Sequence, residues 1–194
     1  MFNNIDLFNP DKIIQCASLK EAKDIYEIMK KMDAKSYVYA ISYLTGGILN
    51  PVIKIGMSSP DKYRQHTILG ERIVRQISNL EGWSSKPVSS HGLDLVVGLK
   101  KAIETGILPE KAINRNNIII CIWNVHPNFR KCNSIATEDE QTKWLEGKLC
   151  SLHKKHFQKL PPLNVIDPSV SVFFRKGRIP TNEDLDNTLF EWQQ

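Results

Sequence analysis

Apolar residues recur along the chain at two spacings, which predict where it forms helices and where it forms strands. Over 18–32 they recur with the period of an α-helix, and Ser18 with Glu21 is typical of a capping box at the start of such a helix. The longest helical pattern covers 137–159 and carries acidic residues in its first turn. The same spacing predicts shorter helices over 70–83, 92–105, 109–114 and 182–193.

Four segments carry strand patterns. The runs 37–43 and 52–57 are rich in β-branched and aromatic residues, and glycine, asparagine and proline separate them, which indicates a β-hairpin. The run 118–125 is apolar on both faces and predicts a central strand that is covered on two sides. A final strand is expected over 169–180. A small sheet combined with helices predicts an α+β fold.

The composition narrows the class of protein. The chain has 194 residues, which favours a single domain over 1–194, and 41% of them are hydrophobic while 24% are charged, as in soluble globular proteins. No apolar run reaches the roughly 20 residues of a membrane helix, and the N-terminus has no signal-peptide pattern. We therefore expect a cytoplasmic protein without a membrane partner. The cysteines form no CxxC pair, which favours free thiols over a zinc site.

The charge is compatible with a polyanionic partner. Lys and Arg number 26 against 21 Asp and Glu, which gives a net charge of +5. Two basic groups are candidates for contacts with DNA phosphates, although a run of charges is more often simply solvated. They are the pair Lys154 and Lys155 in the long helix, and the basic turn formed by Arg175, Lys176 and Arg178.

Five features follow one another in a suggestive order. The tripeptide YVY (37–39) lies in the first strand of the hairpin, and KIG (54–56) lies in the second. An arginine follows in the helix over 70–83, Glu146 lies in the middle of the long helix, and Asn164 follows a proline pair after that helix. This order resembles the GIY-YIG nuclease family, in the branch where lysine replaces the tyrosine of the second motif. The first motif here has tyrosine where the family has glycine.

The resemblance implies how the chain is organised. A GIY-YIG-like core would comprise 36–83 and 118–165, with a small antiparallel or mixed sheet flanked by helices. The segment 84–117 would then be a helical insertion, while 1–35 and 166–194 would be flanking extensions. Sequence specificity, if the protein has any, would reside outside the shared core.

Two arginines compete for the position that the family fills with a catalytic arginine. Arg64 follows the glycine of the second motif by a spacing that fits a short loop. Arg72 instead opens a helix, and Ile73 and Ile77 follow it at core spacing. We prefer Arg72 and keep Arg64 as the alternative.

The resemblance also implies a chemistry for each position. Glu146 would hold one divalent metal ion, Mg²⁺ or Mn²⁺, since a hard cation that keeps most of its waters suits a lone carboxylate together with a substrate phosphate. Tyr39 would act as the general base, and Lys54 would either lower the pKa of that phenol or bind the scissile phosphate. The arginine would grip the phosphate oxygens bidentately. Asn164 would orient the site through hydrogen bonds.

The resemblance implies a divalent-metal-dependent DNA endonuclease of the restriction type or the phage or mobile-element type, and cutting both strands would favour a homodimer. An alternative is a nucleic-acid-binding module that keeps the fold without cutting, which the altered motifs favour. A further alternative is an interaction protein unrelated to nucleic acid, in which the order of motifs is a coincidence. That alternative predicts that Tyr39, Lys54, Arg72 and Glu146 do not cluster.

Overall fold

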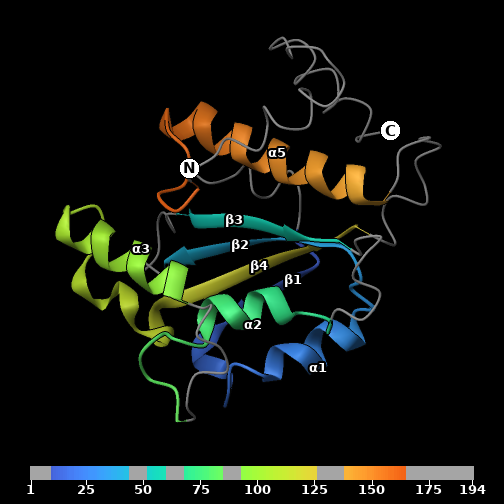
Figure 1. Cartoon of the computed structure of the whole chain (residues 1–194), viewed down its shortest axis with the longest axis horizontal. Coiled ribbons are helices and arrows are strands. Elements are labelled where there is room, and N and C mark those ends of the chain that lie inside the picture. The colour runs from blue at the N-terminus through green and yellow to red at the C-terminus, as the bar shows by residue number, and fades with distance from the viewer. Residues whose placement is uncertain (1–9, 44–51, 60–67, 85–92, 126–137, 165–194) are drawn as a thin grey trace.

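The computed structural model describes residues 10–43, 52–59, 68–84, 93–125 and 138–164. These residues form an α+β structure in which a four-stranded antiparallel sheet lies between two layers of helices (Figure 1). The predicted α+β class and the antiparallel sheet are therefore confirmed for this part of the chain.

The sheet has the strand order β1-β4-β2-β3, so β2 and β4 are central and β1 and β3 are its edges. The strands are β1 (Lys12–Gln15), β2 (Tyr37–Tyr43), β3 (Val52–Ser58) and β4 (Ile118–Asn124). The helices are α1 (Asp24–Lys31), α2 (Glu71–Ile77), α3 (Leu93–Glu104) and α5 (Glu138–Phe157). Short 3₁₀ turns are η2 (Cys16–Ser18), η4 (Glu110–Ile113) and η5 (Arg115–Asn117).

The alternation of side chains along β2 divides the hydrophobic core into two halves. Tyr37, Tyr39 and Ile41 pack on the face covered by α1, α2 and α3, as the period of two in a strand requires. Val38 and Ala40 pack on the opposite face, which α5 covers. Because every residue of β2 and β4 is buried, both central strands are covered on two sides.

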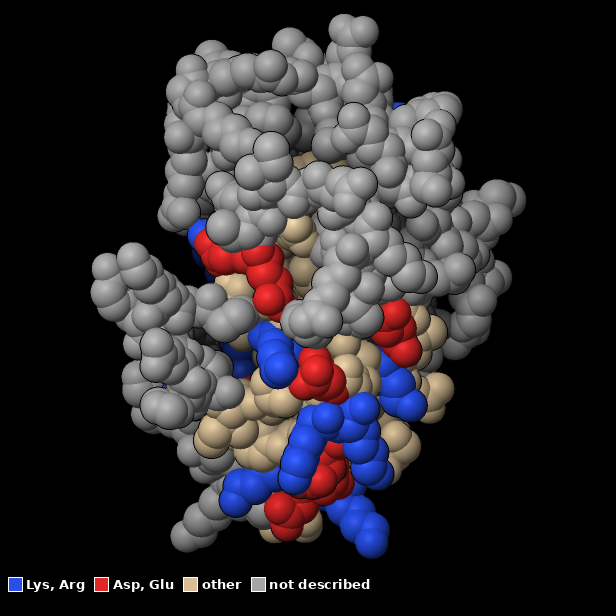
Figure 2. Space-filling view, turned by 90° about the vertical axis from the view of Figure 1, so that its right-hand side faces the viewer, with Lys and Arg blue, Asp and Glu red and all other residues tan. Residues whose placement is uncertain are grey.

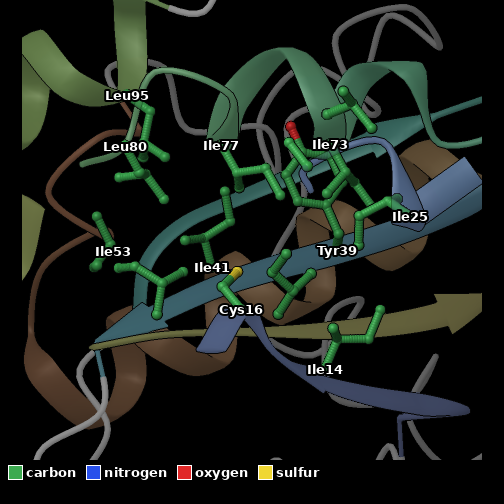
Figure 3. Packing of buried hydrophobic residues seen from close by; sticks show 14 of the residues in the cluster. Ile14, Cys16, Ile25, Tyr39, Ile41, Ile53, Ile73, Ile77, Leu80 and Leu95 are labelled. Atoms are coloured by element: carbon green, nitrogen blue, oxygen red, sulfur yellow. The ribbon is translucent and has the colours of Figure 1, made fainter. Parts of the chain in front are cut away.

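The larger half of the core holds α2 against the sheet. Figure 3 shows Ile73 and Ile77 of α2 facing Tyr39 and Ile41 of β2. Burial of branched aliphatic side chains of this size stabilises a fold by roughly 1.5–3 kcal/mol each. The helix that carries the candidate arginine is therefore fixed by its apolar face, and its polar residues are presented at set positions.

Most elements begin and end where the sequence predicts. Within the described residues, no helix combines the length and the apolar character needed to cross a bilayer. The elements predicted over 37–43, 52–57, 92–105, 109–114, 118–125 and 137–159 are confirmed to within two residues at each end. The strand predicted over 169–180 and the helix predicted over 182–193 lie outside the described residues.

The helix predicted over 18–32 is present but shorter than expected, as α1 (Asp24–Lys31). The chain forms the edge strand β1 and a 3₁₀ turn first, and the helix begins only at Asp24. The expected capping box is absent, because the Ser18 hydroxyl donates to the carbonyl of Gln15 at 2.8 Å. The carboxylate of Asp24 accepts from the backbone N–H groups of Lys20 and Glu21 at 2.7 and 3.0 Å. These bonds form a turn that delays the helix.

The helix predicted over 70–83 is also shorter than expected. It ends as α2 at Ile77, and the indole N–H of Trp83 donates to the carbonyl of Ile77 at 2.9 Å. The same carbonyl also accepts from the N–H of Leu80 at 3.0 Å, so two donors meet the end of the helix in a tight turn. The chain then turns at Gly82, whose φ is 91°.

The described part of the expected insertion shares the main core. Leu95, Leu99 and Ala102 of α3 belong to the same buried cluster as the tyrosines of β2. On the same helix, a β-carbon at Gly98 would lie 2.1 Å from Cδ2 of Leu163, so the chain leaving α5 packs directly on α3. The described residues 93–117 therefore pack into the main structure through α3.

Candidate active site

Tyr39 of β2 and Gly56 of β3 are partners in the register of the hairpin. A β-carbon at residue 56 would lie 2.6 Å from both Cζ and the hydroxyl oxygen of Tyr39, so the phenol ring lies across the glycine. Glycine leaves room for the ring, whereas any side chain would displace it. The glycine of the KIG motif therefore has a structural reason in this chain.

Tyr39 is enclosed in the core. Its side chain reaches from β2 toward α2 beside Ile73, and it is only 1% exposed (Figure 3). The ring of Tyr37 lies 6.2 Å away between centroids, at a tilt of 46°. Burial is the main cause that raises the pKa of Tyr39 above its ordinary value. The charge of Arg72 opposes this rise in pKa, whereas Glu146 adds to it.

Glu146 lies in the middle of α5 and is partly buried. Burial raises the pKa of its carboxyl group from 4.5 to about 7. The positive charges of Arg72, Lys54 and Lys143 oppose that rise in pKa. The charge of Glu146 raises the pKa of Tyr39, although α5 covers the face of the sheet opposite α2.

Four of the predicted site residues therefore share one electrostatic environment, although they come from four separate elements. The grouping is not the one expected of an interaction protein in which the order of motifs is a coincidence. The four residues are Tyr39 on β2, Lys54 on β3, Arg72 on α2 and Glu146 on α5.

Lys54 is held by a residue that the sequence analysis did not identify. Its ammonium group donates to Oε1 of Gln76 at 3.0 Å. Gln76 is buried on α2, one helical turn after Arg72. The spacing of four residues from the candidate arginine is the signal that could have found it, because residues four apart lie on one side of a helix.

Arg72 lies in the first turn of α2 and is exposed. Gly70 lies two residues before Arg72, and its φ is 83°. A β-carbon at Gly70 would lie 2.8 Å from Cγ of Met29. That glycine allows both the turn into the helix and the close approach of α2 to α1. The structure thus brings Arg72 to the predicted site, whereas Arg64 lies outside the described residues.

Asn164 binds the backbone of the edge strand. Its Oδ1 accepts from the N–H of Ile55 at 2.8 Å, and its Nδ2 donates to the carbonyl of Ile55 at 2.8 Å. Next to it, the N–H of Leu163 donates to the carbonyl of Ile53 at 3.0 Å. The amide therefore satisfies backbone groups that an edge strand leaves without a partner. It supports the residue between Lys54 and Gly56.

The basic residues proposed for DNA contact are placed only in part. Lys154 and Lys155 are exposed toward the C-terminal end of α5. The basic turn with Arg175, Lys176 and Arg178 lies outside the described residues. Figure 2 shows that described Lys and Arg residues on one face of the molecule are interspersed with Asp and Glu. The described part of that face is therefore mixed in charge and not uniformly basic.

A divalent metal ion fits the donor set if the substrate completes its coordination. No three His, Cys, Asp or Glu side chains gather as a possible metal site among the described residues, so Glu146 belongs to no such group there. Mg²⁺ commonly binds through one or two carboxylates together with waters and phosphate oxygens. A partly buried carboxyl group whose pKa is about 7 would also be stabilised in its ionised form by a nearby cation.

No protein-family model, no curated protein and no solved structure matches the chain. The resemblance to GIY-YIG nucleases therefore depends on the motifs and their order, together with the clustering described above.

Proposed function

We propose that the chain is a divalent-metal-dependent endonuclease with a GIY-YIG-like core, and that it hydrolyses phosphodiester bonds of DNA. The supporting observation is the grouping of Tyr39, Arg72 and Glu146 around the β3 edge, with Lys54 beside them. Their order in the sequence led to the expectation that they would lie together. Four residues from separate elements would have no reason to meet if the order of the motifs were a coincidence.

The roles follow from exposure and charge. Arg72 is exposed, so its guanidinium is free to bind the oxygens of a phosphate from solvent. Lys54 supplies a second positive charge on the neighbouring strand. Glu146 would hold Mg²⁺ or Mn²⁺, and that ion would neutralise the negative charge that develops on the phosphate. Cutting of both strands would require two copies of the chain, which we propose to act as a homodimer.

Tyr39 is the proposed general base, and its burial sets a condition on that role. A phenol accepts a proton only as the phenolate, which burial disfavours. The positive charge of Arg72 lowers the pKa of Tyr39 and so favours the ionised form. Substrate and its metal ion would have to add to that effect at the β3 edge.

Plasmid cleavage tests the proposal. The wild-type protein should nick or linearise DNA with Mg²⁺ and lose this activity in EDTA. Glu146→Gln keeps the shape of the side chain but removes the charge, and it should abolish cleavage. Glu104→Gln on α3 is the matched control, since Glu104 is exposed and has no role in the site, and it should cut like the wild type. An active Glu146→Gln protein would refute the assignment of the metal ligand.

A second candidate is a module that binds nucleic acid without cutting it. The observation that favours it is the 1% exposure of Tyr39, which leaves the phenol little access to water. This candidate predicts DNA binding at low salt that survives Glu146→Gln, with no cleavage by the wild type in any divalent metal. Binding measured beside the cleavage assay separates the two candidates.

A further inference from the structure

We infer that Gln76 is a positioning residue, which holds the ammonium group of Lys54 in place within the site while leaving its charge intact. This inference rests on the proposed nuclease function for its consequences in catalysis. The contact itself does not depend on that function, because the hydrogen bond between Lys54 and Gln76 is present in the structure without any substrate.

The contact joins two elements that the sequence separates widely. Gln76 lies on α2 and Lys54 on the edge strand β3, and the ammonium nitrogen and the amide oxygen are 3.0 Å apart. Gln76 is buried, between residues of α2 that pack into the main core. A buried amide costs free energy unless its polar atoms have partners, so the hydrogen bond to Lys54 explains why an amide is tolerated there.

A neutral acceptor suits a lysine that must act as a cation. Lys54 has a long side chain with many rotamers, and a fixed acceptor at its end selects the conformations that keep the charge at the β3 edge. A glutamate at residue 76 would also accept the hydrogen bond, but its negative charge would cancel the positive charge of the lysine. Glutamine orients the ammonium group without bringing a negative charge of its own to it.

The position of Gln76 links it to the other cation of the site. Arg72 and Gln76 are one turn apart on α2, so one short helix places the guanidinium and the acceptor for Lys54 together. Both Arg72 and Lys54 act on the carboxyl group of Glu146. We therefore expect Gln76 to set the relative position of the two positive charges.

The first test observes Lys54 without DNA. In ¹⁵N NMR of lysine ammonium groups, a hydrogen-bonded Lys54 should give a signal that exchanges slowly with water, assigned by its loss in Lys54→Met. Gln76→Met, which has a similar size but no comparable acceptor, should broaden or remove that signal, and Gln76→Glu should retain it. The ammonium group of Lys143, which pairs with Asp139 on α5, is the internal control and should not change. An unchanged Lys54 signal in Gln76→Met would overturn the inference.

The second test is a double-mutant cycle on DNA cleavage. Gln76→Met should slow cleavage by about tenfold or more, as expected for a lost hydrogen bond to a charged group. The same substitution should have no further effect when Lys54 is already methionine. Independent, multiplying effects would show that Gln76 acts otherwise than through Lys54 and would overturn the positioning role. Gln76→Glu should also be slow, although it keeps Lys54 ordered, because it cancels the charge.

The two tests separate failure of the inference from failure of the proposed function. A wild-type protein that cuts no DNA but shows the ordered Lys54 signal, lost in Gln76→Met, would refute the nuclease and support the positioning contact. A protein that cuts DNA but whose Lys54 signal does not depend on Gln76 would support the nuclease and refute the positioning contact.

Discussion

The phenol ring of Tyr39 lies across Gly56, so that a β-carbon at residue 56 would come within 2.6 Å of the hydroxyl oxygen. Gly56→Ala should therefore displace the ring and cost about 1–3 kcal/mol of stability, as overpacking in a core does. Chemical denaturation measures the loss. Cleavage should fall as well, because the displaced hydroxyl leaves the β3 edge.

A double variant checks the cause of that loss. If the ring of Tyr39 is the obstacle, Gly56→Ala should cost much less in a Tyr39→Ala background, where the ring is absent. Additive losses of stability in the double variant would contradict the contact and would point to a backbone effect at residue 56.

The raised pKa of Glu146 predicts how stability depends on pH in the absence of metal. Its pKa is about 7 in the folded chain and 4.5 in the unfolded reference, so the folded state binds the proton more tightly. The contribution of this group to the free energy of unfolding is fully present below pH 4.5. It is lost as the pH rises toward 7 and above. Glu146→Gln stays neutral, so its stability advantage over the wild type should grow across this range. Urea denaturation at a series of pH values in EDTA measures it, and an advantage that shrinks with rising pH would contradict the shift.

The same carboxyl group predicts competition between protons and Mg²⁺. A ligand must be deprotonated to bind a metal ion, and a carboxyl group with a pKa of about 7 is mostly protonated at pH 6. The Mg²⁺ concentration that gives half-maximal cleavage should therefore be about tenfold higher at pH 6 than at pH 8. A titration of cleavage with Mg²⁺ at both pH values gives the ratio. A ratio near one would indicate that Glu146 is already ionised at pH 6 or is not the ligand.

The sequence predicted the parts of the fold that depend on local patterns. The hairpin strands, the central strand and the long helix follow from hydrophobic periodicity, which packing in the sheet then preserves. The edge strand β1 was missed, because its four residues carry a weak pattern and pair with β4, far along the chain. The late start of α1 depends on the side chain of Asp24, whose backbone partners cannot be inferred from spacing alone.

The candidate site was predictable as a set of residues but not as a set of contacts. The order of the motifs singled out Tyr39, Lys54 and Glu146, and those residues share one environment. The bond between Lys54 and Gln76 depends on how α2 docks on the sheet, which no local pattern encodes. The burial of Tyr39 likewise arises from tertiary packing, and it changes what the phenol can do.

Asn164 gives a prediction about the edge strand. Both its polar atoms bind the backbone of Ile55, so Asn164→Leu leaves an N–H and a carbonyl without partners at a partly buried position. Unpaired buried groups cost about 1–3 kcal/mol each, so the variant should be destabilised by a few kcal/mol. Hydrogen exchange of the Ile55 amide should become faster. The rate should increase by a larger factor there than at the amides of the central strands. Asn116→Leu is the matched control, because Asn116 is exposed in a 3₁₀ turn away from the sheet edge, and it should leave that amide protected. Unchanged protection of Ile55 in Asn164→Leu would mean that β3 holds its position without the asparagine.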